Sequence, residues 1–241
     1  MTELGVGQGD PVESARTYAL FEERFRGTRE EIRERQLDAL RFVAPFVGSE
    51  SPVLDIGCGR GEWLELLRDA GIRAYGVDLN GAMVQQALEA GVDARHENAL
   101  EHLSDSVEES SLQAVTAFHL VEHVPQSVLI QLVRLVFRSL QPGGQLLVET
   151  PNPTNVAVGA AAFYLDPTHR RPVHPQYLSF LAEASGFTDV QVHFVHPVQE
   201  PEGDVPGDLA PRVRRIIEAG EWSLFGPQDY LLVATKPAAS A

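Results

Sequence analysis

The sequence predicts an α/β protein in which helices cover both faces of a mostly parallel, seven-stranded, doubly wound sheet. From residue 52 onward, short apolar segments alternate with amphipathic ones, as they do where helices connect parallel strands. A loop with three glycines follows the first apolar segment, and an acidic residue ends the second. The 241 residues are enough to bury a sizeable core without disulfides. We therefore expect one Rossmann-like domain over residues 13–236.

The predicted strands are short apolar runs that are bounded by glycine, proline or polar residues. They cover residues 53–56, 74–77, a short segment near Ala94, and residues 114–118, 145–149, 190–195 and 230–235. The predicted helices have apolar side chains at three- to four-residue spacing. They cover residues 62–70, 82–90, 126–140 and 176–185.

Residues 13–48 predict a helical cover, which Gly27 and Thr28 divide in two. Thr28 is the expected N-cap of the second helix, with Glu31 as its capping-box partner. We expect flexible tails over residues 1–12 and 237–241. Residues 197–211 are rich in proline, glycine and acids, which indicates an insertion between two strands, either a solvated loop or a mobile lid over a substrate cleft.

The charge balance excludes one class of partner. Thirty-four Asp and Glu residues outnumber nineteen Lys and Arg residues, for a net charge of -15. Binding DNA, RNA or an anionic membrane surface requires basic residues, so none of these is an expected partner. The single cysteine, Cys58, cannot form an internal disulfide. No apolar run reaches the ~18 residues of a membrane span, and we expect no integral membrane contact and a cytoplasmic location.

The strongest candidate site is the glycine loop. Gly57, Gly59 and Gly61 alternate with other residues between the first predicted strand and the first helix that follows it. Glycine adopts backbone angles that other residues avoid, and it lets a ligand approach the main chain closely. The helix that follows offers unpaired N–H groups at its start. Because the spacing differs from that of dinucleotide-binding loops, a more compact ligand is expected.

Two polar residues follow the next two strands. Asp78 ends the second strand, where an acid can bind ribose hydroxyls, although it could instead cap the next helix. Asn98 comes after the third strand, where it could reach the edge of an adenine ring or serve as an ordinary turn residue. Together with the glycine loop, these positions favour a nucleoside ligand.

Five motifs in this order resemble those of the class I S-adenosylmethionine-dependent methyltransferases. They are VLDIGCGRGEW at 53–63, YGVDLN at 75–80, ENALEHL at 97–103, AFHLVEHV at 117–124 and LQPGGQLLVETPNP at 140–153. The resemblance implies that S-adenosylmethionine binds at the glycine loop. The donor-binding residues that it implies are Gly57, Gly59 and Gly61 in the loop, Asp55 as its support, Asp78 and Leu79 at the ribose, Asn98 and Ala99 at the adenine, and His119 and Arg29 at the methionine end.

Narrower resemblances imply the acceptor. FRGTREEI at 25–32 and FYLDPTHRRP at 163–172 are similar to methyltransferase domains of bacterial polysaccharide biosynthesis, of the O-antigen chain-terminating type. This likeness implies a saccharide hydroxyl as the acceptor, which is the function that the sequence favours. AFHLVEH is also similar to ubiquinone-pathway O-methyltransferases, whose motif has been linked to a divalent metal. O-methylation of a phenolic or quinone-like metabolite is therefore one alternative, and a non-catalytic donor-binding regulatory module is another.

A second group of candidate residues is titratable. Glu122 and His123 follow the fourth strand, and Asp166 and His169 follow the fifth, so all four reach the carboxyl end of the sheet. If the first segment is helical, His123 shares a face with His119. His169 or His123 could act as a general base. Alternatively, Glu122, His123 and His169 could hold a divalent metal such as Mg²⁺ or Mn²⁺, or the group could be structural.

The remaining candidates concern the acceptor. Arg26, Arg170 and Arg171 could bind an anionic group, because guanidinium suits phosphate or carboxylate. Tyr164 could stack on a sugar ring. His196 lies beside a predicted strand, where the sequence indicates no partner for it. The oligomeric state stays open, with a homodimer as one alternative.

Overall fold

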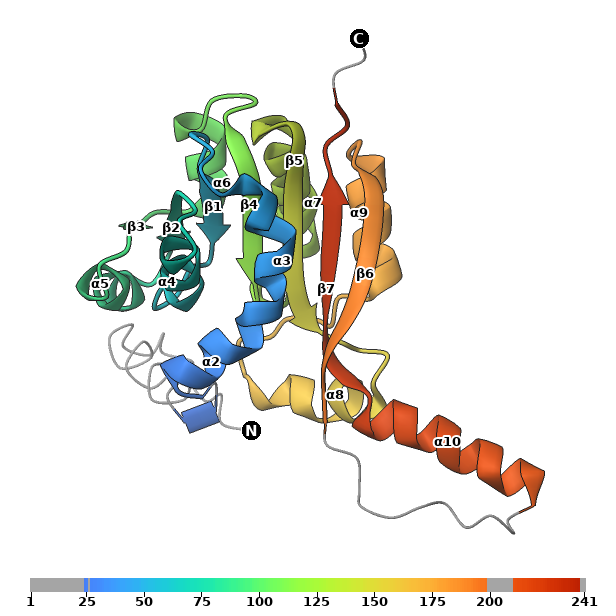
Figure 1. Ribbon diagram of the computed structural model, residues 1–241. Coiled ribbons are helices and arrows are strands. Elements are labelled where there is room, and N and C mark those ends of the chain that lie inside the picture. Colours follow the sequence, from blue (N-terminus) through green and yellow to red (C-terminus); the bar gives the residue numbers. More distant parts are fainter. Residues whose placement is uncertain (1–23, 26, 199–209, 239–241) are drawn as a thin grey trace, which may run out of the picture.

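The computed structural model describes residues 24, 25, 27–198 and 210–238 (Figure 1). The predicted fold class is confirmed, because these residues form a seven-stranded sheet in the order β3-β2-β1-β4-β5-β7-β6. The strands are β1 (Val53–Ile56), β2 (Ala74–Asp78), β3 (Ala94–His96), β4 (Leu112–Phe118), β5 (Leu140–Pro151), β6 (Thr188–Pro197) and β7 (Pro227–Thr235).

Strands β1 to β5 all run parallel, and β7 lies antiparallel between β5 and β6. The parallel strands therefore end at one edge of the sheet, where the doubly wound fold places its ligands. The antiparallel insertion brings the start of β7 and the end of β6 to this same edge, since Asp229 pairs with Pro151 and with Val195.

Helices connect the strands and cover both faces of the sheet (Figure 1). The helices are α2 (Arg29–Gln36), α3 (Leu40–Val43), α4 (Glu62–Asp69), α5 (Gly81–Glu89), α6 (Ala99–Glu101), α7 (Gln126–Ser139), α8 (Val156–Ala160), α9 (Pro175–Ala184) and α10 (Pro211–Phe225). Short 3₁₀ turns cover Leu37–Ala39, Ala44–Phe46, Val121–His123 and Ala162–Leu165, and a π-helical turn covers His102–Ser106. In the part of the chain described here, no helix combines the length and the apolar character that a membrane span requires.

The core consists of two apolar layers, one on each face of the sheet. Strand β1 is buried along its whole length, and its successive side chains point to opposite faces. Val53 packs in the layer that holds α3, α4 and α5. Leu54 packs in the layer that holds α7 and α9. Burial on both faces explains why β1 is almost continuously apolar in the sequence.

Two local predictions have different outcomes. The capping box at the start of α2 is confirmed, because Thr28 and Glu31 hydrogen-bond each other's backbone N–H groups. The expectation that residues 197–211 lead directly from one strand to the next is wrong, since α10 lies between β6 and β7. Its apolar side chains, such as Ile216, are largely exposed, and the sequence signal is correspondingly weak. Residues 199–209 and 1–12, with their predicted insertion and tail, lie outside the described residues, as do 239–241 of the second tail.

Candidate active site

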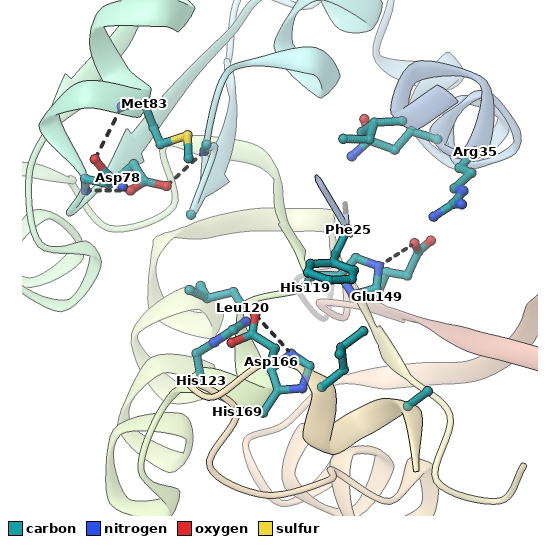
Figure 2. Close-up of a pocket in the computed structure, with 17 residues that line it drawn as sticks. Phe25, Arg35, Asp78, Met83, His119, Leu120, His123, Glu149, Asp166 and His169 are labelled. Carbon is teal, nitrogen blue, oxygen red and sulfur yellow. Dashed lines mark hydrogen bonds and ion pairs between the residues drawn. The ribbon is translucent and has the colours of Figure 1, made fainter. Parts of the chain in front are cut away.

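A cavity of about 380 Å³ opens at the carboxyl ends of the parallel strands. Its walls come from α2, the glycine loop, the end of β2 and the segments that follow β4 and β5. Asp78 and Met83 lie toward one end, and His123, Asp166 and His169 lie toward another (Figure 2). The two groups of residues that the sequence singled out therefore face one cavity.

The glycine loop forms one end of the cavity through its backbone. Gly57 and Gly59 line the cavity and have positive φ angles of 73° and 53°. A Cβ atom at Gly57 would lie 3.0 Å from a methyl carbon of Leu120, so a larger residue would be both strained and crowded. Gly61, with φ 85°, starts α4 instead and packs against Ala87 and Val92, away from the cavity.

Asp78 fastens this loop to the end of β2. Its carboxylate accepts a hydrogen bond from the Gly59 N–H at 2.9 Å and another from the Asn80 N–H at 2.7 Å. The cap of α5 is Asn80, whose side chain accepts from the N–H groups of Ala82 and Met83. The helix-cap interpretation of Asp78 is therefore wrong. A carboxylate has about four lone-pair positions, so Asp78 keeps acceptor capacity toward the cavity that it lines.

Several predicted donor-binding residues lie outside the cavity wall. Asp55 is buried behind the loop and accepts a hydrogen bond from Thr116 Oγ1 at 2.7 Å, which fits the predicted supporting role. Asn98 caps α6 through its side-chain oxygen, and Ala99 is the first residue of that helix. Leu79 is 68% exposed. Contacts of Leu79, Asn98 and Ala99 with the donor remain predictions.

The helical cover presents residues other than those predicted. Arg29 binds the Arg60 carbonyl and the Glu65 carboxylate at 3.0 and 2.8 Å, so it joins α2 to the glycine loop and α4 and does not line the cavity. Arg26 lies outside the described residues. Arg35 and Gln36 line the cavity, and the sequence analysis missed them. The available signal was their spacing from Ile32, which places all three on one face of α2.

His169 and Asp166 form the other end of the cavity. His169 Nδ1 lies 2.6 Å from the Phe163 carbonyl oxygen. A carbonyl can only accept a hydrogen bond, so Nδ1 carries the proton and Nε2 keeps a lone pair in the neutral ring. That Nε2 lies 3.9 Å from a carboxylate oxygen of Asp166. The sequence analysis predicted both residues, and the fold brings them together.

His123 joins this end through Thr168. The Thr168 hydroxyl donates to Asp166 at 2.6 Å and contacts His123 Nδ1 at 2.9 Å. The rings of His123 and His169 meet edge to face, with centroids 4.7 Å apart. Burial, together with the nearby His169, lowers the pKa of His123 and so favours its neutral form. Although burial opposes it, hydrogen bonding from Thr168 lowers the pKa of Asp166.

His119 does not share a helix face with His123, contrary to the conditional expectation. It has a positive φ of 52°, and a 3₁₀ turn follows it. Its ring lies between two buried carboxylates, with Glu122 at 3.3 Å and Glu149 at 3.4 Å. His196, for which the sequence indicated no partner, lies 3.3 Å from the same Glu149 oxygen. The available signal was Glu149 itself, an acid at the end of a buried strand.

The three predicted acceptor residues that the structure describes, Tyr164, Arg170 and Arg171, do not reach the cavity wall. The Arg171 guanidinium contacts Gln126 at 3.2 Å and lies over the Tyr177 ring. Arg170 is joined to the site only through its backbone N–H, which donates to the Glu122 carbonyl. Tyr164 is 68% exposed and packs edge-on against Phe163. Roles of these residues in acceptor binding remain predictions.

The predicted metal ligands do come together. One ligand atom each from Glu122, His123 and His169 lies within 4.8 Å of the others. However, the second Glu122 oxygen accepts a hydrogen bond from Thr150 at 2.8 Å, and His169 is held by the Phe163 carbonyl. The arrangement is compatible with metal assistance by these three residues. It is equally compatible with His169 acting as a general base without a metal.

Comparisons with known proteins define the family. A methyltransferase domain family matches residues 28–192. The crystal structure of an S-adenosylmethionine-dependent methyltransferase from Archaeoglobus fulgidus is 37% identical, with a TM-score of 0.81, and the match covers 91% of this chain and 99% of that one. The chain therefore belongs to the methyltransferase domain family. Its sheet and glycine loop are those of the class I enzymes, whose cofactor is S-adenosylmethionine.

Curated relatives match over a shorter length. A probable S-adenosylmethionine-dependent methyltransferase of Mycolicibacterium smegmatis is 35% identical over 137 residues, 56% of this chain and 51% of that protein. A ubiquinone biosynthesis O-methyltransferase of Ralstonia nicotianae is 32% identical over 124 residues, 50% of each protein. The chain spans about half the length of these curated relatives.

The cavity fits the cofactor of this class. Gly57 and Gly59 line the cavity without side chains, so a ligand can approach the main chain closely, and Asp78 offers acceptors suited to ribose hydroxyls. Gln36 lines the cavity with a buried side-chain oxygen that has no hydrogen-bond partner within the described ranges, and this acceptor suits an ammonium group. Among the described residues that form the wall, Arg35 is the one lysine or arginine, and it suits a carboxylate.

Proposed function

We propose that this chain is an S-adenosylmethionine-dependent O-methyltransferase that acts on a phenolic hydroxyl of a small, quinone-like metabolite. The observation that carries the proposal is the orientation of His169. Its Nδ1–H is engaged by the Phe163 carbonyl, which leaves the Nε2 lone pair available, and His169 lines a cavity that also contains the glycine loop. A base and a donor loop in one cavity are what methyl transfer to a hydroxyl requires.

The donor end binds through the groups described above. Asp78 accepts hydrogen bonds from the ribose hydroxyls, Arg35 pairs with the methionine carboxylate, and Gln36 accepts from the amino group. When bound, S-adenosylmethionine supplies an electrophilic methyl group. Because α2 carries Arg35 and Gln36 and is joined to the glycine loop by Arg29, this helix covers the donor and excludes water from it.

His169 removes the acceptor proton at Nε2 as the hydroxyl oxygen bonds to the methyl carbon. The proton on Nδ1 stays in its hydrogen bond with Phe163. Asp166, held by the Thr168 hydroxyl and N–H, is close enough to stabilise the imidazolium that forms. A general base of this kind contributes roughly 10²–10⁴-fold to the rate.

Two considerations favour a phenol over a saccharide. A phenol loses its proton near pH 10, as tyrosine does, so histidine deprotonates it far more readily than an aliphatic hydroxyl. Several named relatives are ubiquinone biosynthesis O-methyltransferases, including one from Idiomarina loihiensis that is 30% identical over 157 residues, 58% of this chain and 63% of that protein. Apolar wall residues such as Phe25, Leu120 and Leu165 suit an aromatic ring.

A saccharide hydroxyl is the second candidate, and a specific observation favours it. His123, Glu149 and Asp166 also line the cavity, and such a concentration of polar groups suits the several hydroxyls of a sugar. The non-catalytic alternative predicts donor binding without transfer.

The test is a transfer assay with a radiolabelled methyl donor, run in parallel on catechols, monophenols, and mono- and oligosaccharides. We expect label in the catechols or phenols and none in the saccharides. Label in saccharides alone would reverse the choice of acceptor. Calorimetry distinguishes the other outcomes, because donor binding with no transfer supports the regulatory module, and no donor binding contradicts the whole proposal.

A parallel assay after EDTA treatment separates the two chemical routes. General-base transfer by His169 continues without a metal. Loss of transfer that returns with Mg²⁺ or Mn²⁺ would instead support metal assistance, which the sequence assigned to Glu122, His123 and His169.

A further inference from the structure

A second cluster of potential ligands lies at the cavity wall, apart from the proposed base. One ligand atom each from His119, Glu149 and Asp229 lies within 4.8 Å of the others. They come from three elements, since His119 follows β4, Glu149 belongs to β5 and Asp229 to β7. The proposed reaction uses none of them, so their convergence calls for another explanation.

The contacts in this cluster differ from an ordinary histidine–carboxylate pair. His102 and Glu97, elsewhere in this chain, form such a pair with a hydrogen bond of 2.6 Å. In the cluster, the contacts of Glu149 with His119 and His196 are longer, at 3.4 and 3.3 Å. Ligand atoms that each lie about 2.2 Å from a shared cation are roughly 3 to 4.5 Å apart. The spacing therefore resembles atoms arranged around a common point.

The second nitrogen of His119 has the support that a metal-bound histidine requires. His119 Nδ1 lies 3.3 Å from Glu122 Oε1, and Glu122 is fully buried. The other Glu122 oxygen accepts from the Thr150 hydroxyl at 2.8 Å. A carboxylate that receives the non-ligating N–H of a histidine fixes its tautomer and orients the ring toward a metal. Glu122 is thereby placed to hold His119 Nε2 toward Glu149.

The charges of the cluster also favour a cation. Glu149 and Asp229 are carboxylates that approach each other in a largely buried place. Two carboxylates this close repel each other, and no hydrogen bond or ion pair joins the Asp229 carboxylate to the described part of the chain. A divalent cation between the two carboxylates would remove this repulsion. His196, beside Glu149, is near enough to become a further ligand.

We propose that His119, Glu149 and Asp229 form a binding site for one divalent cation, with His119 coordinating through Nε2. One imidazole and two carboxylates suit Mn²⁺ or Fe²⁺, and Zn²⁺ less selectively. Because His119 and Glu149 line the cavity, the remaining coordination positions face it and are open to water or to an acceptor oxygen. This ligand set differs from Glu122, His123 and His169. In it, Glu122 orients the ligand His119 and does not bind the ion, and His169 remains available as the base.

Binding of Mn²⁺ alone tests the site without any reaction. The full chain is stripped with EDTA, dialysed and titrated with MnCl₂, and free Mn²⁺ is followed by electron paramagnetic resonance. We expect one Mn²⁺ per chain. The bound ion should show coupling to one imidazole nitrogen, or to two if His196 also coordinates, and His119→Gln should remove one coupling.

Isosteric variants identify the ligands. Asp229→Asn and Glu149→Gln should each weaken Mn²⁺ binding by at least about 100-fold, and Glu122→Gln by about 10- to 100-fold, as expected for a residue that orients a ligand. His123→Ala is the matched control and should bind Mn²⁺ like the wild type. Circular dichroism and thermal melting confirm that each variant is folded.

Two results would overturn the proposal. One is an absence of stoichiometric Mn²⁺ binding by the folded wild type at millimolar concentration. The other is binding that survives in Asp229→Asn and Glu149→Gln but is lost in His123→Ala, which would assign the ion to the other set. Methyl transfer is measured separately by the transfer assay, so failure here is distinguishable from failure of the proposed function.

Discussion

The two ends of the cavity present different chemical groups. At the donor end, Gly57 and Gly59 present backbone, and Asp78 holds that backbone in place through two hydrogen bonds. At the acceptor end, the surface consists of titratable side chains, of which His169 and Asp166 are the nearest to the proposed reaction. Binding at the donor end therefore depends on the backbone conformations that the chain can adopt. The chemical step at the acceptor end depends on the ionisation states that the fold imposes on the side chains.

This difference matches the tasks of the two ends. A donor shared by a whole family is bound by features that any sequence can supply with a few glycines and one acid. An acceptor and its proton need particular groups at particular places, and these can change while the sheet stays the same. Variants at the two ends should consequently separate binding of the donor from the chemical step.

The largest effect is expected for His169→Ala. Loss of the base should lower kcat for methyl transfer by roughly 10²–10⁴-fold, while the donor Kd from calorimetry should stay within about twofold. His193→Ala, at a histidine of β6 outside the cavity wall, is the matched control. A variant with near-wild-type kcat would show that the acceptor end is not organised around this ring.

Asp78→Ala should produce the next largest effect, and at the opposite end. The substitution removes the hydrogen bonds that the Gly59 and Asn80 N–H groups donate to the charged Asp78 carboxylate. Each hydrogen bond of this kind is worth about 1.5–3 kcal/mol. Loss of about 3 kcal/mol of this total raises the donor Kd by roughly 100-fold, as measured by calorimetry with S-adenosylmethionine. Asp93→Ala removes an exposed acid just before β3, outside the cavity wall, and should leave Kd unchanged. Equal effects of both would mean that general charge, and not the loop, determines donor binding.

Arg35→Gln should have a smaller effect on the same constant. An exposed ion pair is worth up to about 1 kcal/mol, so we expect the donor Kd to rise by about fivefold and to become less sensitive to salt. Arg41→Gln, a substitution on α3 outside the cavity wall, serves as the control. An unchanged Kd with unchanged salt dependence would remove Arg35 from the donor end.

The smallest effect concerns Cys58 in the glycine loop. Burial, assisted by the negative charges of Asp55 and Asp78, raises the pKa of this thiol. The raised pKa leaves the thiolate form unpopulated at pH 8, where a free cysteine is partly ionised. Iodoacetamide should therefore label the native chain far more slowly than the urea-unfolded chain, with mass spectrometry as the readout. Rapid native labelling would indicate that the donor end opens readily.

Much of the sheet could be predicted because the pattern is local. Each strand from β1 to β4 was expected at its place, since apolar runs between glycine and polar residues are read without knowledge of the fold. The bounds of β1, Val53–Ile56, agree fully with the prediction. Helix α10 was missed for the opposite reason. Ile216 and its apolar neighbours face outward for the most part, and no burial reinforces their helical spacing.

The candidate site divides in the same way. Gly57, Gly59 and Asp78 lie within 22 consecutive residues, and the requirement for positive φ selects glycine whatever surrounds it. Arg29 and Arg171 were assigned to ligands because arginine suits anions, but their partners could not be foreseen. Glu65 lies 36 residues from Arg29, and Gln126 lies 45 residues from Arg171.

By itself, the sequence determined the order of the strands and of the helices that connect the parallel ones, the glycine loop and the acid that holds it, because each depends on neighbours in the chain. Only the tertiary structure decided that β7 enters the sheet antiparallel beside β5 and so brings Asp229 and His196 to Glu149 and His119. Side chains from β5, β6, β7 and the residue after β4 meet there, because β4, β5 and β6 end, and β7 begins, at one edge of the sheet. The charge of each depends on that meeting, since burial and neighbouring charges together set a pKa.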